Sequence, residues 1–127
     1  MGLTYTTLTL TNLFNKKSIR IQALVDTGST FMCVTEEMAT QLGFDASEWS
    51  TQIVTLADGR QMKAPRIEPV KITFDETRSY TTEALVLGNE ALMGVLPLEA
   101  MDLVVDPVRQ QVIVNPAHPN FPVALAK

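Results

Sequence analysis

Three consecutive residues, Asp26, Thr27 and Gly28, bring together an acid, a hydroxyl and a glycine directly after an apolar run. A carboxylate at the end of a buried strand is partly desolvated, which costs free energy unless hydrogen bonds or a shared proton offset it. Thr27 can join a local hydrogen-bond network, and Gly28 lets another backbone come close. The tripeptide therefore indicates a catalytic carboxylate. It is also typical of an ordinary β-turn, and only the surrounding sequence can distinguish the two interpretations.

The run before Asp26 alternates as a strand does. Its apolar side consists of Ile19, Ile21, Ala23 and Val25. A similar pattern over Thr4 to Phe14 predicts a second strand. Because Asn15 to Lys17 is short and polar, we expect the two strands to form a hairpin that braces the acid.

The segment after Asp26 predicts a short helix. Thr35 is a suitable N-cap, Glu36 and Glu37 favour the first turn, and Gly43 is a suitable stop. Trp49 is predicted to lie in the core or in a groove wall, with the core favoured.

Asp58-Gly59 predicts a two-residue hairpin loop between strands over Gln52 to Ala57 and Arg60 to Ala64. From this window alone a plain exposed turn is the preferred interpretation. Pro65 and Pro69 predict a bend or an edge before a strand over Val70 to Phe74. Tyr80 to Leu87 predicts a further strand, covered on both sides where it is continuously apolar.

A second signal lies near the C-terminus, where Leu92, Met93 and Gly94 are followed by a short helix that we expect over Pro97 to Leu103. Val104 to Asp106 and Gln111 to Val114 then predict a hairpin that Pro107 turns. Residues 115–127 read as a Pro-containing tail, in which we expect His118 to be solvent-exposed. With six or more strands and one or two short helices, the chain is mainly β.

Composition and charge argue against several classes of partner and site. The 127 residues, 46% of them hydrophobic, suit one domain. A net charge of −4, with no basic cluster, argues against nucleic acid as a partner. Cys33 is the single cysteine and is expected in the core, and no His/Cys spacing indicates a metal. Because no signal-peptide pattern or long apolar segment is visible, we expect a soluble cytoplasmic protein without membrane contact.

Together these motifs resemble the retropepsin-like aspartic proteases, the single-domain, retroviral-type members of the pepsin clan. Leu24 to Ser29 is similar to their catalytic loop, and residues 52–64 fall where their flap hairpin lies. The segment from Leu92 to Leu103 resembles their hydrophobic-hydrophobic-Gly motif and helix. The resemblance implies a closed β-barrel lobe over residues 1–114 with a flap hairpin, and a tail over residues 115–127.

The resemblance also implies an aspartic endopeptidase that needs two facing carboxylates. Since Asp26 is the only acid in such a motif, two chains must pair as a homodimer around it. Catalysis is then assigned to Asp26, Thr27 and Gly28, without metal or other cofactor. Contacts with an extended, hydrophobic peptide or protein substrate are assigned to Gly28, Ser29, Thr30, Ala57, Asp58, Gly59, Met93 and Gly94. In this context the Asp58-Gly59 hairpin is interpreted as a flap.

Two departures from the family pattern are visible. Thr30 and Val95 replace an Asp and an Arg that form a buried ion pair in retropepsins, so this part of the subunit contact must differ. The prolines of the tail are poor continuations of a central strand, which predicts a weak or substrate-dependent dimer.

Two other classes of function remain open from sequence. The main alternative is a catalytically weak or inactive peptide-binding or assembly module with the same fold. A phosphate-handling enzyme with Asp26 as phosphoryl acceptor is weaker, because no glycine-rich cradle, nearby lysine or cluster of acids accompanies this residue.

Overall fold

The computed structural model of the chain describes residues 3–124. Its first half contains β1 (Tyr5–Asn12), β2 (Ser18–Val25), β3 (Met32–Val34), α1 (Glu36–Gln41), a 3-10 turn (Ala46–Glu48) and β4 (Ser50–Thr55). Its second half contains β5 (Gln61–Asp75), β6 (Arg78–Val86), β7 (Ala91–Met93), α2 (Val95–Ala100), β8 (Leu103–Asp106) and β9 (Gln111–Val114). The chain is therefore mainly β, as predicted. No helix in residues 3–124 is long and apolar enough to cross a membrane.

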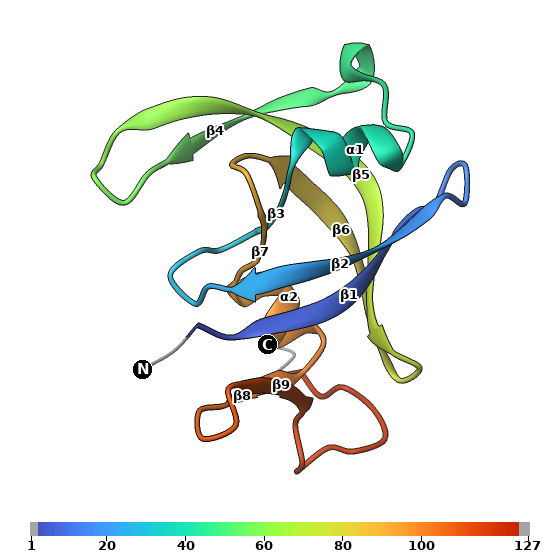
Figure 1. The fold of residues 1–127 in the computed structure, drawn as a ribbon, viewed down its shortest axis with the longest axis vertical. Coiled ribbons are helices and arrows are strands. Elements are labelled where there is room, and N and C mark those ends of the chain that lie inside the picture. Colours follow the sequence, from blue (N-terminus) through green and yellow to red (C-terminus); the bar gives the residue numbers. More distant parts are fainter. Residues whose placement is uncertain (1–2, 125–127) are drawn as a thin grey trace.

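Six strands close into a barrel (Figure 1). Seven strands form one sheet in the order β1-β2-β7-β3-β6-β5-β4, and β1 also pairs with β5 through contacts such as Thr9 with Thr73. This second pairing joins the ends of the six-strand ring and leaves β4 outside it. The expected closed barrel is confirmed.

The alternating pattern of the first two strands explains their position. In β1 the side chains of Leu8 and Leu10 are buried, and in β2 those of Ile21 and Ala23 are buried. Because the two strands pair in antiparallel register, Leu8 opposite Ile21, their apolar sides face the same core. The predicted hairpin is confirmed, and β2 lies between β1 and β7 in the sheet.

The predicted first helix is confirmed as α1. The side-chain oxygen of Thr35 accepts a hydrogen bond from the Met38 amide, which is the expected N-cap. Gly43 follows the helix with a φ of 79°, a conformation that glycine adopts without strain. Trp49 is half-buried against the core, and its ring N–H donates to the Phe44 carbonyl at 3.2 Å.

Three local predictions need correction. The second helix runs over Val95–Ala100 and not from Pro97 to Leu103, because Gly94 occupies its N-cap and Leu103 already begins β8. The strands expected before Pro65 and after Pro69 are one continuous strand, β5, and the bend or edge expected there corresponds to a register shift between Ile67 and Val70. The three-residue strand β3 was not predicted at all.

The tail also differs from expectation. The barrel is followed by the β8–β9 hairpin, which lies at the opposite end of the molecule from β4 (Figure 1). Residues 115–124 then contact Asp102, the residue before β8. His118 is only half-exposed, because its ring lies against the Asp102 carboxylate. Residues 125–127 of the predicted tail lie outside the described residues, and the boundary between domain and tail at residue 114 stays a prediction.

Candidate active site

The backbone of Asp26 is fixed on both sides. It follows β2, which pairs with β1 on one edge and runs parallel to β7 on the other. The Val25 amide donates to the Thr4 carbonyl at 2.8 Å, and the Asp26 amide donates to the Met93 carbonyl at 3.0 Å. Two neighbouring strands therefore set where this carboxyl group leaves the sheet.

A tight turn follows at once. The Gly28 amide donates to Oδ1 of Asp26 at 2.9 Å, and the Ser29 amide donates to the Asp26 carbonyl at 3.0 Å. A Cβ at Gly28 would lie 3.2 Å from that same Oδ1, which is closer than most side chains tolerate. Asp26 itself is half-buried, and Oδ2 accepts no hydrogen bond from any residue in the described range 3–124. One carboxylate oxygen is thus held and the other is free.

The Leu92-Met93-Gly94 motif and the helix after it hold this turn in place through hydrogen bonds. Amides of Gly94, Val95 and Leu96 donate to the carbonyls of Phe31, Ser29 and Thr30, at 3.1, 2.9 and 2.9 Å respectively. These carbonyls belong to the loop of residues 26–31, which we call the acid loop. Gly94 and the start of α2 therefore supply hydrogen-bond donors to three carbonyl groups of the acid loop.

Gly94 makes this brace possible by its lack of a side chain. A Cβ there would lie 2.6 to 2.7 Å from backbone atoms of Ser29, Thr30 and Phe31. Met93 is completely buried and Gly94 is buried as well, so within one chain both hold the acid loop. Their direct contact with a substrate stays a prediction.

Ser29 is half-buried, and its side chain lies close to the buried Cys33 thiol. Burial raises the pKa of that thiol, the contact with Ser29 opposes the increase, and the charge of Asp26 adds to it. Within residues 3–124 the Ser29 hydroxyl makes no hydrogen bond to the Asp26 carboxylate. Thr27, Gly28 and Thr30, by contrast, are exposed at the surface of the loop.

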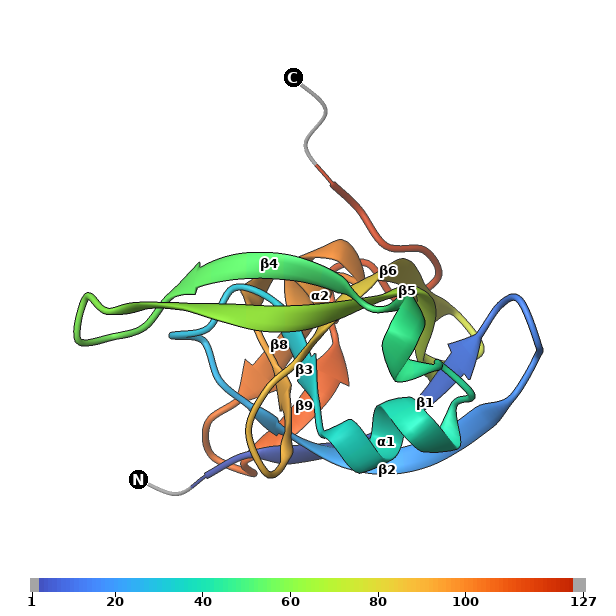
Figure 2. The same ribbon diagram turned by 90° about the horizontal axis from the view of Figure 1, so that it is seen from above.

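The hairpin of β4 and β5 reaches out from the barrel on the same side as the acid loop (Figures 1 and 2). Its loop is Ala57 to Gly59 and not the predicted two residues, because Leu56 still pairs with Arg60 and the Gly59 amide closes the turn onto the Leu56 carbonyl. Gly59 has a φ of 89°, which suits a turn that ends in a left-handed residue. Ala57, Asp58 and Gly59 are all exposed.

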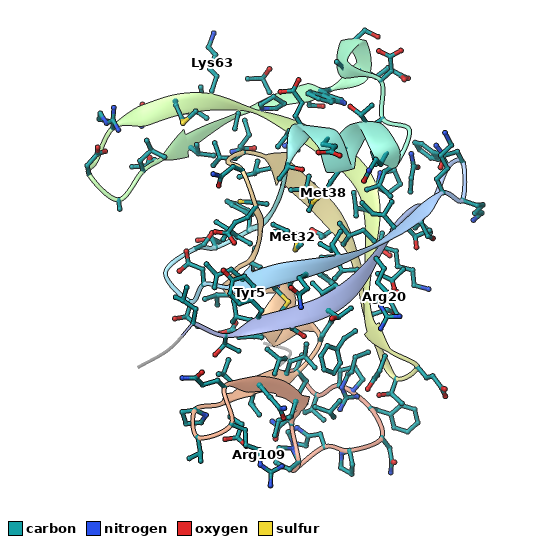
Figure 3. All side chains as sticks on the ribbon, in the orientation of Figure 1. Tyr5, Arg20, Met32, Met38, Lys63 and Arg109 are labelled. Atoms are coloured by element: carbon teal, nitrogen blue, oxygen red, sulfur yellow. The ribbon has the colours of Figure 1, made fainter. Side chains whose placement is uncertain are left out.

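The two faces of this hairpin differ. Lys63 points away from the barrel (Figure 3) and pairs with Ile53, so both lie on the outer face. Val54 and Met62 form the next pair and therefore lie on the opposite, inner face. At this pair the inner face is apolar and partly accessible, with Met62 38% exposed.

Arg66 fastens the base of the hairpin, which the sequence alone did not reveal. Its guanidinium donates to the Gln52 side chain at 3.1 Å and lies 3.7 Å from the carboxylate of Glu83 on β6. The three residues come from three strands, so no local pattern signals them. In residues 3–124 no group of three or more His, Cys, Asp or Glu side chains is placed to hold a metal ion.

Comparisons with known proteins agree with this geometry. The sequence profile of the family described as aspartyl protease matches residues 12–107. Among solved structures, a retropepsin-like aspartic protease from Rickettsia conorii is 26% identical, with 83% of this chain and 85% of that chain covered and a TM-score of 0.57. No curated protein is significantly similar to the chain in sequence.

Proposed function

Because the chain belongs to the aspartyl protease family, we propose that it is an endopeptidase that works as a homodimer with one Asp26 from each subunit. The main support is Asp26 itself, whose Oδ1 is held by the Gly28 amide while Oδ2 stays uncommitted. The motif occurs once in this sequence, and we assign the second carboxylate to a second copy of the chain. Such a twofold contact is the commonest kind in soluble oligomers.

The paired carboxylates would share one proton. Two like charges a few ångströms apart cannot both ionise without a large cost, which is the known behaviour of the aspartic protease dyad. The ionised oxygen then takes a proton from water, while the protonated partner polarises the scissile carbonyl and can pass its proton on. Both roles follow from Asp26 alone, and the braced acid loop supports them because it limits how far each carboxylate can move.

The neighbouring residues take supporting roles in this proposal. Thr27 is exposed beside the acid and would contact the partner loop, while Gly28 and Thr30 would lie along the substrate backbone. Ser29 is assigned to substrate contact from sequence, and its side chain also lies close to Cys33.

An extended peptide would bind between the acid loop and the hairpin, adding backbone hydrogen bonds as a further strand does. Ala57, Asp58 and Gly59 would form the tip of a flap over it, and the apolar pair Val54 and Met62 on the inner face supports a preference for hydrophobic side chains. Met93 and Gly94 would act mainly from beneath the loop.

The test compares the parent protein with Asp26→Asn on a mixed peptide library between about pH 4 and 7. The substitution keeps the acceptor for the Gly28 amide and removes the charge, so we expect cleavage to fall by about a thousandfold or more with the fold intact. Asp106→Asn is the matched control, because Asp106 ends β8 and, among residues 3–124, its carboxylate contacts only Val108 and Arg109 of the following turn. Cleavage by Asp26→Asn at the parent rate would refute the proposal.

Sedimentation separates the protease from the peptide-binding alternative. A protease must dimerise, alone or with a peptide inhibitor bound, at the concentration where it cleaves. A chain that binds peptides, stays monomeric and leaves them intact would be the inactive module.

A further inference from the structure

The segment after β9 is tied to the rest of the molecule by one carboxylate. We call residues 115–124 the strap. Oδ1 of Asp102 accepts from the Asn115 side chain at 3.0 Å, and Oδ2 accepts from the Val123 amide at 3.0 Å and meets Nδ1 of His118 at 2.7 Å. The Asn115 amide also donates to the Asp102 carbonyl at 3.0 Å. Asp102 thus contacts residues at both ends and in the middle of the strap.

A buried cation holds the strap from a second element. Arg78, at the start of β6, is completely buried, and its Nη2 donates to the carbonyl of His118. Its Nε and Nη1 have no hydrogen-bond partner among the described residues. A fully buried guanidinium is costly to leave unpaired, so loss of the His118 carbonyl would be resisted.

The strap is attached at the end of the helix that braces the acid loop. Asp102 follows Met101, the C-cap residue of α2, and its amide donates to the Glu99 carbonyl at 3.0 Å. The other end of this six-residue helix carries the Val95 and Leu96 amides that bind the acid loop. A helix of two turns has few bonds of its own, so its position depends on what holds each end.

The strap and the helix also line one cavity. This cavity is open to solvent, has a volume of about 580 Å³, and is lined by Val123 and Ala124 of the strap and by Leu96 and Ala100 of α2. Leu96 is the residue whose amide binds the Thr30 carbonyl. Strap, helix and acid loop therefore form one continuous set of contacts.

From these contacts we infer that Asp102 and His118 are positioning residues, which hold α2 through the strap and thereby keep the acid loop in place. The effect on catalysis rests on the proposed protease function, whereas the effect on the loop does not. Release of the strap removes the polar contacts at the C-terminal end of α2, leaves Leu98 and Met101 in the core as its anchor there, and loosens the three amide contacts beneath Asp26.

We expect the strap to detach from Asp102 at low pH. Hydrogen bonds from Asn115 and Val123, and the nearby His118, hold the pKa of Asp102 below its usual range, against the opposing effect of burial. The strap is therefore secure above the ordinary pKa of an Asp and is lost as pH falls through the lowered value. The other charged or titratable groups facing this point are Glu99 and Tyr80, which line the same cavity, and Arg78.

The experiment is amide hydrogen exchange by NMR on the full chain. In Asp102→Asn we expect the amides of Val123, Val95 and Leu96 to exchange about tenfold faster or more than in the parent. The matched control Asp106→Asn removes a carboxylate from the adjoining hairpin and should leave all three unchanged. Faster exchange at Val123 alone, with Val95 and Leu96 as in the parent, would overturn the inference, and so would no change at Val123.

A milder pair of variants keeps the test usable if Asp102→Asn does not fold. His118→Ala removes the ring, whereas His118→Asn places an amide donor where Nδ1 stood. We expect His118→Ala to speed amide exchange at Leu96. If peptides are cleaved, we also expect it to lower kcat with little change in KM. His118→Asn should return both the exchange rate and kcat to the parent values. Equal behaviour of the two variants would contradict the inference. Because amide hydrogen exchange needs no substrate, it tests the inference even if the protein proves to be inactive.

Discussion

The acid loop and the hairpin tip are both short turns containing a glycine, yet they are held very differently. The acid loop receives amide donors from the start of α2, and the amide of its first residue, Asp26, donates to the Met93 carbonyl of β7. The tip at Ala57 to Gly59 makes its hydrogen bonds within its own hairpin, and no atom outside it lies within 4 Å of a Cβ built on Gly59.

This difference separates two tasks on one scaffold. A carboxylate that must meet its copy at short range needs a fixed position, and three elements supply it. A cover that must admit a peptide needs freedom to open, and a hairpin attached only at its base supplies that. The comparison predicts that equal changes in the two turns will have unequal effects.

The largest effect is expected for Gly94→Ala. Its φ of −85° suits any residue, so the cost arises only from the backbone atoms of the acid loop that a methyl group would strike at 2.6 to 2.7 Å. We expect the free energy of unfolding to fall by about 3 kcal/mol, because backbone cannot move aside as a side chain can. Urea unfolding measures this. Parent-like stability would show that the loop is not held as tightly as the contacts indicate.

A smaller effect is expected for Gly59→Ala at the hairpin tip. Here there is space for the methyl group, but the φ of 89° strains a residue with a side chain. The expected loss is about 1 kcal/mol in the free energy of unfolding. If Gly59→Ala cost as much as Gly94→Ala under the same urea conditions, the contrast between the two turns would be wrong.

The smallest effect concerns Cys33 beneath the acid loop. Because burial raises the pKa of its thiol, the folded state favours the protonated form. This contribution is complete below the unfolded pKa and is lost as pH rises through the folded value, so stability declines in alkali. Urea unfolding at several pH values from neutral to alkaline measures the decline, and Cys33→Ala should show less of it. Identical pH dependence in the two proteins would remove the thiol as a cause.

Local patterns were sufficient for much of the fold. The alternation around Ile21 and the turn residues after Asp26 act over a few neighbours, so the braced strand and the acid loop could be predicted. The Gly59 turn was placed correctly but given one residue too few, since an Asp-Gly pair fits more than one loop length. The family resemblance, and not composition, supplied the closed barrel.

What could not be predicted depends on contacts between distant segments. The strand β3 has only three residues, too few for a pattern, and is fixed by pairing with β6 and β7. Asp102 and His118 come together across the β8–β9 hairpin, and Arg78 joins them from much earlier in the chain. The tail looked featureless in sequence because its partners lie elsewhere.

The most direct test of the account is a subunit-mixing assay. Parent protein, at a concentration where it is fully dimeric, is equilibrated with an equal amount of Asp26→Asn, and the initial rate of peptide cleavage is measured. If each site needs an Asp26 from both chains, half of the parent subunits enter inactive mixed dimers and the rate falls to about one half. An unchanged rate on adding the mutant chain would mean that one Asp26 is enough, and the proposed mechanism would be wrong.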